Sequence, residues 1–218
     1  PRDTAGPRAM FRVKICGITN LEDALLAADL GAQALGFIFY EKSPRFIRPE
    51  EAGRILAQLP PLVLSVGVFV NEPLEVVAAT AARLRLDWLQ LHGEEPPEYC
   101  RQLDRHLIKA FRVREADFLP RLLPYQGVVR GFLLDTYQAD QVGGTGQTFP
   151  WSLALAAQEY GPVILAGGLT PENVASAIRQ VRPAAVDVAS GVEARPGKKD
   201  PERLRAFLAA VTAAARDL

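Results

Sequence analysis

The chain alternates short runs of Val, Ile, Leu and Phe with helical patterns along nearly all of its length, and this alternation strongly limits the folds it can adopt. Eight strand-like runs can be distinguished, at residues 12–16, 34–39, 63–70, 88–92, 108–112, 131–135, 163–166 and 185–188. The fifth unit is the weakest, because Pro120 and Pro124 interrupt the apolar pattern that follows Arg112.

Helix-start signals lie between the strand-like runs. They are Thr19 before Asn20, Arg48 before Pro49, Asn71 before Glu72 and Pro73, and Thr170 before Pro171. Eight strand-then-helix units predict an α/β protein with a (β/α)8 TIM barrel. A doubly wound sheet is the weaker alternative, because it usually needs fewer strands and a glycine-rich fingerprint, and the chain has no GxGxxG or P-loop motif.

We predict one barrel domain over residues 10–218. Residues 1–9 form a stretch rich in Pro, Gly and Arg, which we expect to be a disordered tail or a remnant of cloning. No apolar run is long enough to cross a bilayer and no secretory leader is recognisable, so we predict a cytoplasmic protein without a membrane partner.

Charge and cysteine content exclude several other classes of protein. The 25 basic and 25 acidic residues give a formal net charge of zero, so we predict no nucleic-acid partner, and any anionic ligand must be held locally. Two cysteines, Cys16 and Cys100, are too few for a disulfide framework. We expect no metal site, because His and Cys residues are not clustered at metal-ligand spacings.

Polar residues and glycines gather where the predicted strands end, which is the face on which barrel enzymes carry their active sites. They are Cys16, Arg45, Asn71, His92, Arg112, Asp135, Gly167, Gly168, Ser190 and Gly191.

Cys16 and Asp135 are the candidates for proton transfer. Lys14 lies two residues before Cys16 on the same strand face, where its charge is expected to lower the pKa of the thiol. Asp135 ends an apolar strand, so partial desolvation is expected to raise its pKa, and the glycine-rich segment 142–148 that follows is a candidate lid. The structural alternatives are a buried apolar cysteine and an aspartate that caps or anchors a loop. Cys100 is assigned a structural role in a predicted helix.

Glycine-containing turns follow the seventh and eighth strands, at Gly167–Gly168 and at Ser190–Gly191. Backbone N–H groups in these two loops, with a helix N-terminus after the eighth strand, predict a phosphate site and hence a phosphorylated small-molecule substrate. Asp187 either stabilises this region or contacts a sugar hydroxyl. Arg45 can pair bidentately with a carboxylate or remain a solvated side chain, and His92 has either a binding or a structural role.

The chain closely resembles the phosphoribosylanthranilate isomerase family. The resemblance rests on the segments VKICGIT, GFIFYEKSPRFI, LQLHG, LLDT, GGTGQTFPW, LAGGLTPENV and VDVASGVEARPGKKD, which occur in the family's order. It implies that Cys16 is the general base and Asp135 the general acid, that Arg45 contacts the anthranilate carboxylate, and that Gly168, Ser190 and Gly191 bind phosphate.

The implied reaction is an Amadori rearrangement in tryptophan biosynthesis. It converts N-(5-phosphoribosyl)anthranilate into 1-(2-carboxyphenylamino)-1-deoxyribulose 5-phosphate and needs no cofactor. Such a mechanism calls for a lowered pKa at Cys16 and a raised pKa at Asp135.

Two other functions remain open. A related isomerase of histidine biosynthesis would be expected to have carboxylates at both proton-transfer positions and two similar half-barrels, and a sugar-phosphate-binding barrel would lack catalysis. The family includes monomers and dimers, and the sequence does not decide whether this chain forms a homodimer.

Overall fold

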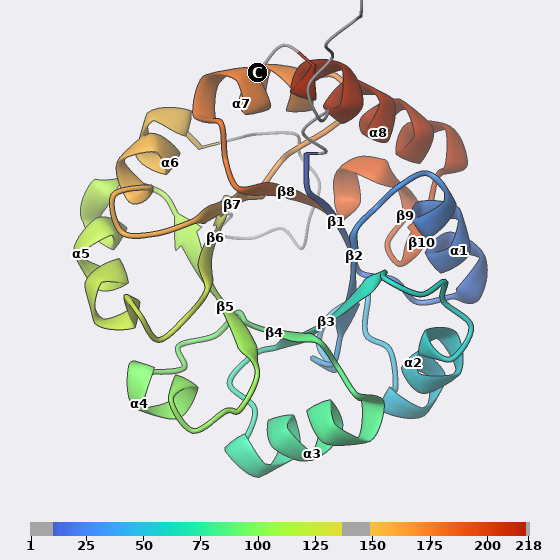
Figure 1. The fold of residues 1–218 in the computed structure, drawn as a ribbon, viewed down its shortest axis with the longest axis horizontal. Coiled ribbons are helices and arrows are strands. Elements are labelled where there is room, and N and C mark those ends of the chain that lie inside the picture. Colours follow the sequence, from blue (N-terminus) through green and yellow to red (C-terminus); the bar gives the residue numbers. More distant parts are fainter. Residues whose placement is uncertain (1–10, 137–148, 217–218) are drawn as a thin grey trace, which may run out of the picture.

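The computed structural model describes residues 11–136 and 149–216, in which eight parallel strands close into a barrel (Figure 1). The strands follow one another around the barrel in chain order, and the last pairs with the first. They are β1 (Val13–Cys16), β2 (Ala34–Ile38), β3 (Leu64–Phe69), β4 (Trp88–Leu91), β5 (His106–Val113), β6 (Gly131–Thr136), β7 (Val163–Leu165) and β8 (Ala185–Val188). The predicted α/β class and (β/α)8 architecture are confirmed.

Helices surround the barrel on its outside (Figure 1). They are α1 (Leu21–Asp29), α2 (Pro49–Leu56), α3 (Leu74–Leu84), α4 (Pro97–Cys100), α5 (Leu119–Leu122), α6 (Trp151–Ala157), α7 (Val174–Val181) and α8 (Pro201–Ala215). None of the helices within the described ranges is long and apolar enough to cross a membrane. The tail expected at residues 1–9 and the candidate lid at 142–148 lie outside the described residues.

Alternation along each strand separates two apolar layers. Ile15 and Leu35 belong to the large core between the strands and the helices, and both are fully buried. Burying side chains of this size stabilises the fold by about 1.5–3 kcal/mol each. Inside the barrel a smaller cluster consists of Val66, Ile108, Ala110, Leu133 and Ala166.

Helix starts differ from the sequence prediction by a few residues. The N-cap of α1 is Asn20 rather than Thr19, because the Asn20 side chain accepts a hydrogen bond from the backbone N–H of Asp23 at 2.9 Å. Helix α2 begins at Pro49, as the signal at Arg48 predicts.

The fifth unit is irregular, as the prolines predict. In place of one long helix it contains the four-residue α5 between the 3-10 helices η1 (Ala116–Phe118) and η2 (Leu123–Tyr125). Pro120 and Pro124 each lie in the first turn of a short segment, where a missing N–H does no harm.

The sequence did not predict the antiparallel hairpin that follows β8. Strands β9 (Glu193–Arg195) and β10 (Lys198–Lys199) come after the 3-10 helix η3 (Ser190–Val192). A turn at Pro196 and Gly197, whose φ of +78° suits glycine, joins the two strands. The hairpin therefore returns the chain towards β1 before α8 begins.

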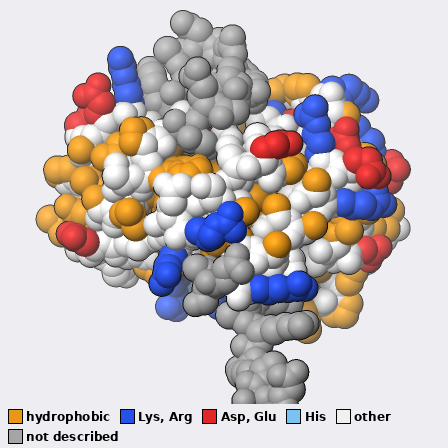
Figure 2. Space-filling view, turned by 90° about the horizontal axis from the view of Figure 1, so that it is seen from above, with side chains coloured by type: hydrophobic (Ala, Val, Ile, Leu, Met, Phe, Trp, Pro, Cys, Tyr) orange, Lys and Arg blue, Asp and Glu red, His pale blue; other side chains and the backbone are white. Residues whose placement is uncertain are grey.

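Acidic and basic side chains are interspersed with apolar and neutral ones on the face of the molecule that Figure 2 shows. This distribution agrees with the formal net charge of zero.

Candidate active site

Cys16 is the last residue of β1 and lies with its thiol at the carboxyl end of the barrel. Cys16 is only 5% exposed. Lys14 lies two residues earlier on the same face of the strand, as predicted. Gly36 is the registered partner of Cys16 on β2. A Cβ atom at Gly36 would lie 2.8 Å from Sγ of Cys16 and 3.2 Å from Cε of Lys14, so glycine provides the space for both side chains.

Lys14 forms a buried ion pair with Asp187 of β8, with Nζ 2.8 Å from Oδ1. The two residues are partners in the register between β1 and β8. Burial disfavours the charged lysine, but the Asp187 carboxylate and the Cys16 thiol outweigh it and raise the pKa of Lys14 to about 12. Asp187 therefore holds a cation beside the thiol, and its predicted contact with substrate stays a prediction.

The pKa of Cys16 is raised, and the expectation of a lowered pKa is wrong for this structure. Burial has the largest effect, because a desolvated thiolate is unfavourable. Lys14 acts in the opposite direction through its charge and a hydrogen bond, but does not compensate for burial. The sequence showed the neighbouring cation and did not show how deeply the thiol lies.

Asp135 lies at the end of β6, and its Oδ1 accepts a hydrogen bond from the backbone N–H of Thr136 at 2.9 Å. Desolvation at the barrel mouth and the negative charge of Asp187 raise the pKa of Asp135 to about 6, although Thr136 and nearby cations oppose the shift. The predicted direction of this shift is confirmed. The acid form of this carboxyl group therefore persists up to about pH 6, and a minor fraction of it remains at neutral pH.

His92 follows β4 and lies across from Asp135, with Nε2 3.6 Å from Oδ2. Burial and the charges of Arg112, Lys14 and Lys109 lower its pKa to about 3, so the imidazole is neutral. The side-chain amide of Gln90 lies 3.1 Å from Nδ1. With the Gln90 nitrogen as donor, Nδ1 accepts and the ring N–H lies on Nε2, facing Asp135.

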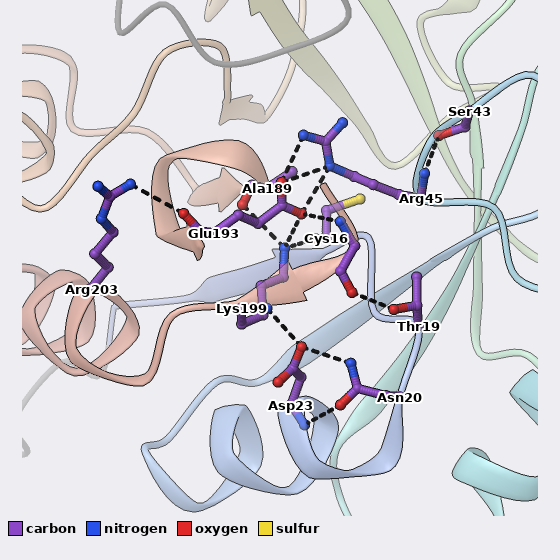
Figure 3. A network of polar contacts seen from close by, with 11 residues as sticks. Cys16, Thr19, Asn20, Asp23, Ser43, Arg45, Ala189, Glu193, Lys199 and Arg203 are labelled. Carbon is purple, nitrogen blue, oxygen red and sulfur yellow. Dashed lines mark hydrogen bonds and ion pairs between the residues drawn. The ribbon is translucent and has the colours of Figure 1, made fainter. Parts of the chain in front are cut away.

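Arg45 is buried and pairs bidentately with a carboxylate, as its predicted chemistry allows, but the carboxylate belongs to Glu193 of β9 (Figure 3). Its Nε lies 2.9 Å from Oε1 of Glu193, and its Nη2 lies 2.7 Å from Oε2. Nη1 makes no hydrogen bond to the described part of the chain. Arg45 is therefore held rigidly with one nitrogen still able to donate.

The loops after β6, β7 and β8 lie against one another. Gly167 and Gly168 have φ of +76° and +65°, which glycine adopts without strain. A Cβ at Gly167 would lie 2.3 Å from the backbone nitrogen of Thr136, and one at Gly191 would lie 1.9 Å from the carbonyl oxygen of Leu169. The glycines thus allow close backbone contact between neighbouring loops.

Three backbone N–H groups in these loops, at Gly168, Ser190 and Gly191, donate to no acceptor within residues 11–136 and 149–216. Ser190 and Gly191 begin the 3-10 helix η3, and the expected helix N-terminus after β8 is this short helix rather than a full α-helix. Free N–H groups on adjacent loops are the usual donors to a bound anion.

A family model described as N-(5'-phosphoribosyl)anthranilate (PRA) isomerase matches residues 13–210. The chain belongs to the phosphoribosylanthranilate isomerase family. A relative in Geobacter metallireducens with the name N-(5'-phosphoribosyl)anthranilate isomerase is 55% identical over 199 residues, or 91% of this chain and 98% of the relative. The resemblance seen in the sequence is confirmed, and the chain is an isomerase of tryptophan biosynthesis.

Solved structures of phosphoribosylanthranilate isomerases have the same fold. One, in complex with reduced 1-(o-carboxyphenylamino)-1-deoxyribulose 5-phosphate, is 48% identical, has a TM-score of 0.83, and covers 96% of this chain and 100% of its own. Another contains monomers generated from the dimeric enzyme of Thermotoga maritima; it is 47% identical, with a TM-score of 0.83 and the same coverage.

Three charged contacts around the isomerase site were not found by sequence reasoning. Glu193 and Lys199 lie in the segment that carried part of the family resemblance, but nothing in the sequence indicates that Glu193 pairs with Arg45 or that Lys199 reaches Cys16 in β1. The pairing of Lys14 with Asp187 requires the barrel to close. Among the described residues, no group of three or more His, Cys, Asp or Glu side chains is arranged to bind a metal ion.

Proposed function

We propose that Cys16 is the general base and Asp135 the general acid in the isomerisation of N-(5-phosphoribosyl)anthranilate to 1-(2-carboxyphenylamino)-1-deoxyribulose 5-phosphate. The observation that carries this proposal is that one buried ion pair acts on both groups. Lys14 opposes the loss of thiolate at Cys16, while Asp187 raises the pKa of Asp135. Each group therefore has one neighbour that favours the form its role requires, although burial keeps the pKa of Cys16 raised.

Ring opening is the first step. Asp135 donates its proton to the ring oxygen of the ribose, the bond between that oxygen and C1 breaks, and the anthranilate nitrogen forms a double bond to C1. The pKa of about 6 leaves enough of the acid form for this transfer. His92 is neutral and presents N–H towards the carboxylate that remains, which it can stabilise without adding a full charge.

Removal of the proton from C2 is the second step. The Cys16 thiolate takes the proton, the bonding electrons form a double bond between C1 and C2, and the positive charge on nitrogen is neutralised. The resulting enolamine tautomerises to the ketone when C1 gains a proton and the hydroxyl on C2 loses one. Lys14 stabilises the thiolate that this step consumes.

Arg45 and the loops after β7 and β8 supply the proposed binding contacts. Gly168, Ser190 and Gly191 provide free N–H groups for the phosphate, and Gly167 allows the loop to approach β6. Arg45 retains Nη1 for the anthranilate carboxylate. These groups hold the two ends of the substrate.

Single-turnover measurement with N-(5-phosphoribosyl)anthranilate tests the proposal. Wild type should form the aminoketose, and Cys16→Ala should lose a factor of about 10²–10⁴ in kcat while still binding product. Near-normal kcat in Cys16→Ala would remove Cys16 from the mechanism. Faster turnover of the aminoaldose of histidine biosynthesis than of this substrate would favour the alternative isomerase.

We also propose that the protein forms a homodimer through the amino-terminal end of its barrel. Leu62, in the loop before β3, is 96% exposed, and Leu64 close by is 39% exposed, so apolar side chains gather at this end of the barrel. A cavity of about 360 Å³ opens at the same end of the barrel, with Leu64, Val66, Trp88 and Ile164 among its lining residues. A second copy that places its Leu62 loop over this cavity would bury both features, and the relative from Thermotoga maritima is described as dimeric.

A further inference from the structure

Lys199, in β10, lies at the centre of the polar network in Figure 3. Its side chain is fully buried, and its ammonium group donates three hydrogen bonds. The acceptors are the backbone oxygen of Cys16 at 2.6 Å, the backbone oxygen of Ala189 at 3.1 Å and Oε1 of Glu193 at 3.0 Å. An ammonium group has three donors, so the whole hydrogen-bonding capacity of Lys199 is used.

Each acceptor belongs to a different part of the site. Cys16 carries the proposed base, Ala189 directly precedes the Ser190–Gly191 turn proposed for phosphate, and Glu193 holds Arg45 through two nitrogens. These parts come from β1, the end of β8 and β9. One side chain therefore connects three elements that must keep a fixed geometry.

The charges of this network favour a bound carboxylate. Burial lowers the pKa of Lys199, and the Glu193 carboxylate opposes this shift. The three acceptors around Nζ require the three donors of an ammonium group, so Arg45 and Lys199 supply two positive charges and Glu193 one negative charge between them. The buried cluster thus retains one positive charge, which complements a single anionic group beside Arg45.

A second anchor fixes the hairpin independently of these contacts. The Lys198 ammonium lies 2.7 Å from carboxylate oxygens of both Asp23 and Glu22 in α1. The backbone N–H of Lys199 also donates to Asp23, at 2.7 Å. Because neither contact reaches Cys16, Ala189 or Glu193, Lys198 is a control for hairpin attachment, at a side chain that is 32% exposed where that of Lys199 is fully buried.

We propose that Lys199 is a positioning residue that holds the backbone of the base, the start of the phosphate loop and the Glu193–Arg45 pair in one arrangement. This inference rests on the proposed function of those three parts. Removal of the Lys199 ammonium group should weaken catalysis and also weaken binding at both ends of the substrate. Lys199 acts on the site only through the residues that it contacts.

The test compares Lys199→Met with Lys198→Met. Each variant replaces a lysine of the hairpin with an unbranched apolar side chain. Both variants therefore lose one positive charge, and they differ in the contacts that are lost. We expect Lys199→Met to lose about 10²-fold in kcat, because displacement by about 1 Å costs this much. Affinities for inorganic phosphate and for anthranilate, measured by calorimetry, should each fall about tenfold relative to Lys198→Met.

A purely structural role would give a different result. Lys199→Met would then have a lower Tm, while kcat per folded molecule and both affinities would stay within about threefold of Lys198→Met, and this outcome would overturn the proposal. A failure of the proposed function would be seen in different measurements. Wild type would then be inactive, or Cys16→Ala would be active. Ligand affinities test Lys199 without reference to turnover.

Glu193→Gln keeps the proposal testable if Lys199→Met does not fold. This change preserves side-chain volume and leaves the Lys199 contacts with Cys16 and Ala189 in place, but it removes the carboxylate that holds Arg45. Anthranilate affinity should fall about tenfold, and phosphate affinity should fall by less than about threefold. Equal losses of both affinities would contradict the separate connections inferred for Lys199.

Discussion

Nε2 of His92 lies 3.6 Å from Oδ2 of Asp135, and the histidine is neutral. A protonated imidazole at this place would lower the pKa of Asp135 and remove its acid form. Burial prevents this, because it lowers the pKa of His92 to about 3. The neutral ring leaves Asp135 able to hold a proton near pH 6 and offers an N–H to the carboxylate after the proton has left.

Both proton-transfer groups have raised pKa values, and this determines the expected pH profile. The active form needs protonated Asp135 and ionised Cys16, whereas ionised Asp135 with neutral Cys16 dominates between the two pKa values. We expect kcat/KM of wild type to fall below about pH 6 and again above the raised pKa of the thiol.

Asp135→Asn should remove the break near pH 6 from this profile. The variant should lose about 10²–10⁴ in kcat/KM, and its residual activity should rise with pH as Cys16 ionises. The measurement is kcat/KM across pH 5 to 10 for wild type and variant. A variant that retains the break near pH 6 would assign that ionisation to another group.

The difference in stability between Asp135→Asn and wild type should also depend on pH. A carboxyl whose pKa rises on folding binds more protons in the folded state, so stability falls as pH increases from about 4 to about 6. Asparagine cannot ionise and avoids this loss. The Tm of the variant relative to wild type should therefore increase between pH 4 and pH 7, as scanning calorimetry can measure. A pH-independent difference would show that Asp135 is not destabilised as a carboxylate.

Lys14→Met should raise the pKa of Cys16 further and leave Asp187 buried without its partner. Breaking such a pair on one side costs about 3–5 kcal/mol. Adding Asp187→Asn should recover much of the stability but should not restore the thiolate. Alkylation of Cys16 by iodoacetamide as a function of pH, read by mass spectrometry, measures the thiol ionisation. An unchanged alkylation profile in Lys14→Met would contradict the electrostatic role of Lys14.

The barrel could be predicted because each strand is a short apolar run and the repeats are local in sequence. Alternation also put Lys14 and Cys16 on one strand face, and the strand ends identified Asp135 and His92. The depth of a side chain was not predictable in this way. Cys16 has the cation that the sequence showed, but its burial determines the direction of its pKa shift.

The polar network lay beyond sequence reasoning because it depends on distant contacts. Arg45 and Glu193 are separated by 148 positions, and Cys16 and Lys199 by 183. The β9–β10 hairpin that brings them together has only five residues in its strands and lacks the longer alternation that predicts a strand. The bidentate chemistry of Arg45 was recognised, but its partner Glu193 was not found, and the contact of Arg45 with the anthranilate carboxylate stays a prediction.

Leu62→Glu should disrupt the proposed homodimer. In the monomer a carboxylate at this exposed position stays hydrated and does not reduce stability. In an apolar interface the same carboxylate would lose its hydration without gaining a partner, which disfavours the dimer. Sedimentation equilibrium should show a dimer for wild type and a monomer for the variant, with unchanged kcat at the distant carboxyl end of the barrel. Leu123→Glu, at a 60% exposed leucine outside the cavity lining, is the control. A monomeric wild type would exclude the interface.

Gly168→Val should block the proposed phosphate site. We expect a branched side chain in the turn after β7 to crowd an anion held by the free N–H groups of Gly168, Ser190 and Gly191. It would also be strained at φ of +65°. Gly127→Val carries comparable strain at φ of +73°, in open space at the opposite end of the barrel, and so controls for the backbone effect.

Relative to Gly127→Val, Gly168→Val should weaken inorganic phosphate and product by about the same factor, at least tenfold, because both ligands use the same donors. Calorimetric titration of each variant measures this. The thiol of Cys16 should keep its alkylation rate, since the proton-transfer groups are untouched. Phosphate affinity in Gly168→Val equal to that of Gly127→Val, or phosphate bound only at the amino-terminal end of the barrel in a crystal structure, would exclude the assignment of Gly168, Ser190 and Gly191.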